Sequence, residues 1–346
     1  MVSAALAILA ACKPAQPTSG PTEPAPNGSL EPVRIAVSRD LVQGSPAADP
    51  QPNEPPAQTN PVPRDPQPRH ADPVPRQDLA PPSFDLQIGK AIVVESPPWN
   101  ATVRRKVQIE QGRQPKLKLI SKKPNRVTDT DAWLETHGLA LPTWVVAANG
   151  RDGNVPSEVP ARFESNKLLR AIHHPDHAIF VYGRDFSSGR FVATATPDLT
   201  LEGFFDFARW RRAPKAKRGD EGFVDQQVAW AERVEGTLFV ESGHNTYAAS
   251  SMGKNAYISA VDAETGALLW RSKPLVSNGT NFIVRDGWIL CGYGFTAERD
   301  YLYVLNARNG KVAQKLPLKS GPKLFFIKGD RLHVRTYNTD YVFSIR

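Results

Sequence analysis

From residue 177 to the C-terminus, short runs that alternate apolar and polar residues follow one another, with turn residues between them. Two of these runs share one pattern: residues 256–270 read AYISAVDAETGALLW, and residues 300–312 read DYLYVLNARNGKV. The offset between the two copies is 300 − 256 = 44 residues. The alternation predicts β-strands with one buried face, and the recurrence predicts an architecture built from repeats.

Each copy predicts a strand, a tight turn and a second strand. Asp262 or Asn306 begins the turn, where a short polar side chain accepts hydrogen bonds from the backbone that follows. Gly266 or Gly310 stands near the end of the turn, where a positive φ is required. Trp270 ends the second strand of the first copy, and we expect it to pack between neighbouring sheets.

Further strands, each led by a turn, extend the repeat in both directions. They cover residues 234–240, 284–290 and 327–334, and a looser copy covers residues 177–182 and 191–196. A repeat of about 40–50 residues made of short strands is typical of a β-propeller.

The segment Val261–Trp270 resembles the PQQ-like, quinoprotein-type propeller repeat, in which a strand ends in Asp, a Thr-Gly turn follows, and the next strand ends in Trp. The copy at residues 304–313 is degenerate, because Asn309 replaces Thr and the Trp is absent. The resemblance covers at least residues 177–346. It implies a fold more than a function, since one fold hosts many functions.

Four copies are visible, and residues 84–160 are long enough for more, so we expect an all-β propeller of about five or six four-stranded blades over residues 84–346. The last copy stops at residues 341–346 without an outer strand, which would leave an open edge. We expect an N-terminal strand to complete that blade, and residues 85–94 are the best candidate. Residues 116–120 predict another strand, and residues 130–138 predict a short helix with a polar cap and a terminal glycine.

The first twelve residues are apolar and end in small residues, as signal peptides do. The run Leu9-Ala10-Ala11-Cys12 resembles a bacterial lipobox, which implies cleavage before Cys12 and acylation of its thiol. Lys13, where an inner-membrane lipoprotein carries aspartate, implies the outer membrane of a Gram-negative envelope. No Lys or Arg precedes the apolar run, so the usual basic start is missing, and the alternative is a chance apolar N-terminus.

The composition separates a polar N-terminal segment from the repeats. More than half of the 32 prolines lie before Phe84, within a segment rich in Ala, Gln, Asn and Asp. Such a segment buries too little apolar surface to fold, so residues 13–83 predict a disordered, semi-rigid tether. The net charge of +8 is spread along the chain and is weak support for an anionic partner.

Loops that join the middle strands of aligned copies should emerge at one end of the propeller. They carry aromatic, amide and charged residues, and the loop at residues 243–255 is longer than a hairpin turn requires. We expect these loops to form a binding face; the alternative is that they are solvated turns whose aromatic residues cap the core. The candidate binding residues are His244, Asn245, Tyr247, Tyr293, Phe295, Arg299, Tyr337 and Asp340.

Other groups of polar residues give weaker indications of a functional site. In the run His173–His177, Pro175 prevents a helical pair of histidine ligands, so we expect a polar turn and no metal site. The basic residues of 209–218 predict a solvated loop or a contact with anionic groups, and Cys291 predicts a core residue. No catalytic motif is present. Adjacent cysteines, which quinoprotein dehydrogenases place over their cofactor, are absent, so we expect neither PQQ nor another cofactor.

Together these patterns predict a non-enzymatic binding or scaffold lipoprotein of the bacterial cell envelope, anchored to the membrane by lipid. Its general plan resembles that of the propeller lipoproteins of the outer-membrane β-barrel assembly machine. The expected partner is an envelope protein or a glycan, and an exported chain is not expected to bind nucleic acid. The alternatives are a propeller enzyme, either a hydrolase or a lyase, and a glycan-binding module.

Overall fold

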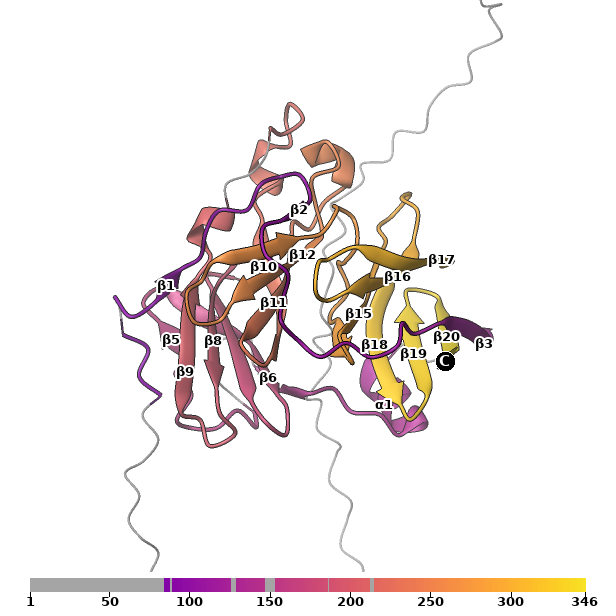
Figure 1. The fold of residues 1–346 in the computed structure, drawn as a ribbon, viewed down its shortest axis with the longest axis horizontal. Coiled ribbons are helices and arrows are strands. Elements are labelled where there is room, and N and C mark those ends of the chain that lie inside the picture. Colours follow the sequence, from indigo (N-terminus) through magenta and orange to yellow (C-terminus); the bar gives the residue numbers. More distant parts are fainter. Residues whose placement is uncertain (1–83, 88, 126–128, 147–152, 186, 212–214) are drawn as a thin grey trace, which may run out of the picture. The chain divides into compact units, whose positions relative to one another are not determined.

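Strands form nearly all of the regular structure in the computed structural model, which describes residues 84–87, 89–125, 129–146, 153–185, 187–211 and 215–346 (Figure 1). These strands form four sheets, and each sheet contains a run of consecutive antiparallel strands. The predicted all-β, propeller-like class is confirmed. The lipobox with Cys12 and the tether lie in residues 1–83, outside the described residues.

The elements have the following bounds. The first sheet contains β6 (Asn166–His173), β7 (Ala178–Gly183), β8 (Gly189–Ala195) and β9 (Leu201–Asp206), with β1 (Ile92–Val93), β4 (Thr143–Trp144) and β5 (Arg162–Phe163) at its edges. The second contains β10 (Gln227–Val234), β11 (Thr237–Gly243), β12 (Tyr257–Asp262), β13 (Leu268–Arg271) and β2 (Thr102–Val103). The third contains β14 (Ile283–Arg285), β15 (Trp288–Tyr293), β16 (Tyr301–Asn306) and β17 (Val312–Pro317). The fourth contains β18 (Pro322–Lys328), β19 (Arg331–Thr336), β20 (Thr339–Ile345) and β3 (Leu117–Pro124). One α-helix, α1 (Thr130–His137), and three short 3₁₀ turns, at Ala208–Trp210, Glu221–Phe223 and Ala248–Ser251, complete the described elements.

The described residues form four sheets, where we expected five or six blades. Residues 84–160 were expected to supply the additional blades, but their strands are added singly to the edges of sheets that the repeats build. Three of these strands, β1, β2 and β4, are only two residues long, and a segment this short cannot form a sheet of its own.

The segment before the helix, residues 89–124, contacts all four sheets in turn, and we call it the strap (Figure 1). β1 pairs in parallel with β9, the outer strand of the first sheet, and β2 pairs with β13 of the second. The backbone N–H of Val107 donates to the carbonyl of Arg308, in the turn between β16 and β17 of the third sheet, at 3.0 Å. The strap thus covers sheet edges that would otherwise expose unpaired backbone groups.

An N-terminal strand completes the last sheet, as expected, but it is β3 and not residues 85–94. β3 pairs antiparallel with β20 from Ile345↔Leu117 to Thr339↔Pro124. Within residues 85–94, the strand β1 instead pairs with β9 of the first sheet. Both segments alternate apolar and polar residues, so the pattern alone could not decide which one meets β20.

The predicted turn between β12 and β13 is confirmed. The carboxylate of Asp262 accepts hydrogen bonds from the backbone N–H of Glu264 at 3.2 Å and of Thr265 at 2.9 Å. Gly266 has φ +70°, and Gly310 in the equivalent turn of the third sheet has φ +68°. The repeat therefore encodes its hairpin through local side-chain to backbone hydrogen bonds and a left-handed glycine.

Trp270 packs between the second and third sheets, as predicted. Its side chain is fully buried, and its indole N–H donates to the carbonyl of Ala307 at 2.9 Å. A Cβ atom placed on Gly310 would lie 2.5 Å from the Trp270 ring, so that turn has no room for a side chain. The same glycine therefore serves both the turn and the packing of the neighbouring sheet.

The predicted short helix is α1. The carboxylate of Asp129 accepts from the backbone N–H of Asp131 at 3.1 Å, and Gly138 ends the helix with φ +58°. Trp133 and Leu134 pack against the fourth sheet, in one cluster with residues of β18. No helix of the described residues is long and apolar enough to cross a membrane.

Candidate binding face

The connections between the second and third strands of each sheet leave the sheets at one end. Because consecutive strands run in opposite directions, the connectors that lead to the next sheet start at this same end. We call these connections and connectors the loop face. Contacts between connectors and loops support this arrangement. The N–H of Lys217, on the connector to the second sheet, donates to the carbonyl of Ser250 in the loop of that sheet at 2.8 Å. The N–H of Tyr337, in the loop of the fourth sheet, donates to the carbonyl of Gly321 on the connector to that sheet at 3.1 Å.

The eight predicted binding residues differ in how far they reach solvent. Tyr247 is 44% exposed and Tyr337 is 72% exposed. His244 and Tyr293 are buried, at 6% and 3%. Asn245 and Arg299 are exposed, and Phe295 and Asp340 are half-buried. Six of the eight side chains are therefore accessible to a partner at least in part.

His244 braces its own loop. Its Nε2 lies 2.7 Å from Oγ of Ser251, and its backbone N–H donates to Oδ1 of Asn255 at 2.7 Å. Burial lowers the pKa of His244 to about 4, so the imidazole is neutral at physiological pH. The long loop that the sequence marked as unusual is thus held by a buried histidine at its base.

Glu298 joins the loops of the second and third sheets. Its Oε1 accepts from the backbone N–H of Ala248 at 2.8 Å, and its Oε2 accepts from the hydroxyl of Tyr293. Beside it the rings of Tyr247 and Phe295 meet edge to face, with centroids 5.1 Å apart. The two loops therefore form one connected surface, which the sequence could not show because these residues lie some 50 positions apart.

A cleft of about 490 Å³ lies next to this junction. Tyr293, Tyr301, Tyr303 and Arg299 are among the residues that line it. The ammonium of Lys315 lies 3.6 Å from the ring centroid of Tyr301, a cation–π contact that keeps a charge at the cleft. Burial raises the pKa of Tyr303 to about 12, so its phenol stays protonated and can donate a hydrogen bond.

Two predicted residues lie apart from this cleft, in the fourth sheet. Tyr337 stands under the ammonium of Lys323, which is 5.0 Å from its ring centroid. Asp340 lies within β20, opposite Arg335 in the strand register, and burial raises the pKa of its carboxyl. The structure thus places Tyr247 and Phe295 next to the cleft, while Tyr337 and Asp340 belong to the fourth sheet.

Sequence reasoning missed two exposed apolar residues of the loop face. Phe223 is 68% exposed on the connector from the first to the second sheet, and Met252 is 59% exposed at the end of the Ala248–Ser251 turn. With Tyr247 and Tyr337, Phe223 completes the set of exposed aromatic side chains among the described residues, and all three are on the loop face. No sequence pattern marked Phe223 or Met252, because their exposure depends on the packing of the connectors.

The remaining sequence predictions have mixed outcomes. Cys291 is fully buried in the core, as expected. In the basic segment, Arg209 and Lys217 are exposed, but Trp210 is buried and its indole N–H donates to the carbonyl of Glu95 at 2.7 Å. That aromatic ring is therefore part of the contact with the strap and is not offered to a ligand.

Comparison with known proteins finds only weak likenesses. No family model matches the chain, and no curated protein matches it. Among solved structures, BamB from Moraxella catarrhalis is 10% identical, covers 66% of this chain and 100% of its own, and has a TM-score of 0.28. A putative gluconolactonase is 16% identical, with coverage of 53% and 61% and a TM-score of 0.33. The computationally designed Ika4 protein is 11% identical, with coverage of 50% and 88% and a TM-score of 0.31. Likenesses this weak say nothing about what the chain binds or does.

Proposed function

We propose that this chain is a lipid-anchored, non-enzymatic binding protein of the bacterial cell envelope that holds a protein partner on its loop face. The observation that carries the proposal is that Phe223, Tyr247 and Tyr337, the exposed aromatic residues of the described part of the chain, all lie on that one face. Aromatic side chains are enriched in interfaces because they bury a large area with few rotatable bonds.

The chemistry of the cleft also favours binding over catalysis. Glu298 is the only carboxylate among the residues that line it, and its two oxygens already accept hydrogen bonds from Ala248 and Tyr293. A hydrolase or lyase would require a free acid or base at such a place. A cleft of phenols and cations, joined to an aromatic surface, is suited to hold a partner.

We expect Tyr247→Ala and Tyr337→Ala to weaken capture of a protein partner by at least about tenfold when combined, since hot-spot aromatics contribute about 2 kcal/mol or more each. The measurement is cross-linking of the full chain in intact cells, followed by mass spectrometry. Ile120→Ala is the matched control, because Ile120 is an exposed apolar residue, at 52%, on β3 and outside the loop face. Loss with the tyrosine variants and retention with the control would support the proposal.

A partner captured equally by the tyrosine variants and by the control would show that the loop face is not the docking surface. Enrichment of saccharide and no protein would favour a glycan-binding module instead.

The anchor is tested separately. Cys12→Ser is expected to move the chain from the membrane fraction to the soluble fraction and to abolish incorporation of labelled fatty acid, because serine offers no thiol to the lipid. Cys291→Ser is the control with the other cysteine, which is buried. A chain that stays in the membrane fraction after Cys12→Ser is not held there by acylation of this residue.

A further inference from the structure

At the other end of the first sheet, the turn between β6 and β7 brings two histidines together. The backbone N–H of His174 donates to the carbonyl of His177 at 2.7 Å and closes the turn. As a result the two imidazole rings are stacked, with centroids 4.6 Å apart and planes at 27°. We expected no metal site in this run because Pro175 excludes a helix, but the tight turn nevertheless places the two histidines side by side. His173 is not part of this pair, because it stacks on Trp144.

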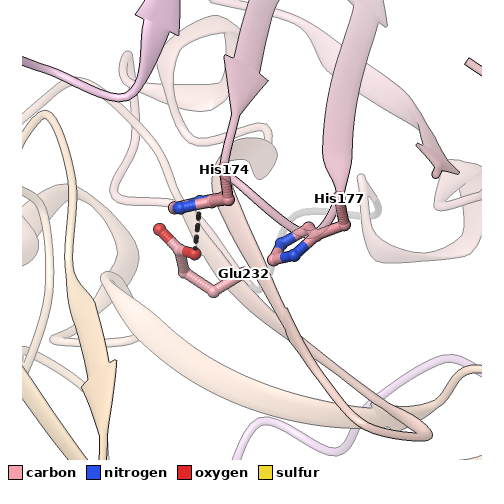
Figure 2. A group of neighbouring side chains, drawn as sticks. All are labelled: His174, His177 and Glu232. Carbon is pink, nitrogen blue, oxygen red and sulfur yellow. Dashed lines mark ion pairs between the residues drawn. The ribbon is translucent and has the colours of Figure 1, made fainter. Parts of the chain in front are cut away.

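The neighbouring sheet supplies a third donor, Glu232 of β10. Its Oε2 lies 3.0 Å from Nε2 of His174. One donor atom from each of His174, His177 and Glu232 lies within 4.8 Å of the others, and Figure 2 shows the three side chains around one small volume. Two imidazoles and a carboxylate are a common ligand set for zinc and other divalent transition metals.

Two of the three donors, Glu232 and His177, are each oriented by a neighbouring residue. The indole N–H of Trp230 donates to Oε1 of Glu232 at 2.7 Å, which leaves Oε2 directed toward the histidines. Oδ1 of Asp176 lies 2.9 Å from Nδ1 of His177, so this nitrogen carries the proton and Nε2 keeps its lone pair. A carboxylate behind a histidine is the usual outer contact of a metal ligand, since it sets the tautomer and the basicity of the ring.

The nitrogen atoms that face a ligand have no hydrogen bond. Nε2 of His174 and Nε2 of His177 are both buried and without a hydrogen-bond partner. Nε2 of His174 has Oε2 of Glu232 within ion-pair distance, at 3.0 Å, whereas Nε2 of His177 has no such neighbour. Leaving a buried polar atom unsatisfied costs about 1–3 kcal/mol, so the unpartnered Nε2 of His177 favours a bound group at this cluster.

An ion pair between His174 and Glu232 without a bound metal ion would explain fewer of these contacts. It would neutralise the two charges but would leave Nε2 of His177 buried without a partner. It would also give no reason for the contacts that orient Glu232 and His177. A bound cation would satisfy all three donors at once.

We propose that His174, His177 and Glu232 bind one divalent transition-metal ion of the zinc type, which links the first and second sheets. Donors of a tetrahedral zinc ion with bonds of about 2.0–2.1 Å lie roughly 3.4 Å apart. Nε2 of His174 and Oε2 of Glu232 are already 3.0 Å apart, so only the wider separations, which stay within 4.8 Å, must shorten on binding, by up to about 1.4 Å. The side chains of His174 and Glu232 are 21% and 11% exposed, which leaves one side of the ion open to water as its fourth ligand. The site lies at the end of the strands opposite to the loop face.

Titration with Co²⁺ tests the site, because Co²⁺ replaces zinc at nitrogen and oxygen ligands and absorbs visible light when bound. The protein is the full chain carrying Cys12→Ser, so that the thiol at position 12 does not compete, after treatment with a chelator. We expect one equivalent of Co²⁺ to bind and to be displaced by Zn²⁺. His177→Gln and Glu232→Gln should each weaken binding at least about tenfold, and Asp176→Asn should weaken it by about 10–100-fold.

His173→Gln is the matched control, since it removes a histidine adjacent to the site that is not a ligand, and it should leave Co²⁺ binding unchanged. Binding that is no stronger than in a chain lacking both His174 and His177, or binding that Glu232→Gln does not weaken, overturns the proposal. If the variants fail to fold, the melting temperature of the Cys12→Ser chain decides. A rise with Zn²⁺ that a chelator reverses supports the site, and an unchanged value overturns it.

Discussion

Replacing Trp270 with alanine is expected to lower the free energy of unfolding by about 3–5 kcal/mol. The indole is fully buried between two sheets, its ring lies 5.9 Å from that of Phe239, and its N–H is bonded to the carbonyl of Ala307. Alanine would leave a cavity at this contact and an unsatisfied carbonyl, and the turn at Gly310 would lose the ring that it packs against. The effect should be large because the contact joins two sheets and cannot be repaired within one of them.

Chemical denaturation at neutral pH measures this loss directly as a lower midpoint. Tyr337→Ala is the control, since it removes an aromatic ring that is 72% exposed and should change the free energy of unfolding by no more than about 0.5 kcal/mol. Trp270→Phe should fall between the two, because it keeps most of the packing and loses the hydrogen bond. An unchanged midpoint for Trp270→Ala would mean that the packing of the second sheet on the third contributes little to stability.

Glu241→Gln is expected to stabilise the protein at pH 8 and to leave its stability nearly unchanged at pH 4.5. Glu241 is buried in β11, where it accepts a hydrogen bond from the hydroxyl of Ser277. Burial raises the pKa of Glu241 from 4.5 to about 7, although the Ser277 bond and the charge of Arg170 act in the opposite direction. Above pH 7 the folded protein therefore holds a buried carboxylate at a cost of roughly 3 kcal/mol, which the neutral amide avoids.

The direction in which stability changes with pH follows from comparing the protons bound by the folded and unfolded states. Between pH 4.5 and 7 the folded state holds a proton on Glu241 that the unfolded state releases, so stability from this group rises as the pH falls. His244 acts in the opposite sense over nearly the same range. Because burial lowers its pKa from 6.5 to about 4, its contribution to stability is lost as the pH falls from 6.5 to 4. The two effects largely cancel in the native protein.

Glu241→Gln should expose the pH dependence of stability that is due to His244, because it removes the carboxylate whose titration opposes it. We expect its free energy of unfolding to fall between pH 6.5 and 4, while that of the native chain stays flatter over the same range. Denaturation at pH 8, 6.5 and 4.5 measures both profiles, with Glu264→Gln as the control, because Glu264 is exposed in the turn after β12. A Glu241→Gln variant less stable than the native chain at pH 8 would contradict the assigned burial cost.

Local structure was predictable from the residues that specify it. The turn after Asp262 needs an acceptor at its start and a left-handed residue at Gly266, and both requirements are written within five positions. The helix α1 likewise carries its own cap at Asp129 and its own stop at Gly138. These elements depend on hydrogen bonds between neighbours in the chain, so the sequence predicted them correctly.

Contacts between distant segments were not predictable in this way. The sequence indicated that an N-terminal strand would complete the last sheet, but register and packing along the strap placed β3 there. In the binding face it located the loops, yet it could not show that His244 and Tyr293 are buried while Phe223 is exposed. Exposure is set by which connectors pack over a residue, and those connectors come from other sheets.

The histidine cluster combines, at one site, local structure that the sequence predicts and a long-range contact that it does not. By itself the sequence determined the strands, their turns and the repeat, since these follow from alternation and from local hydrogen bonds. The sequence run 173–177 also excluded a helix correctly, through Pro175. Only the tertiary structure decided that Glu232 meets His174, because these residues are 232 − 174 = 58 positions apart and are joined by the packing of one sheet on the next. Such packing depends on the fit of whole surfaces, which no short stretch of the chain contains.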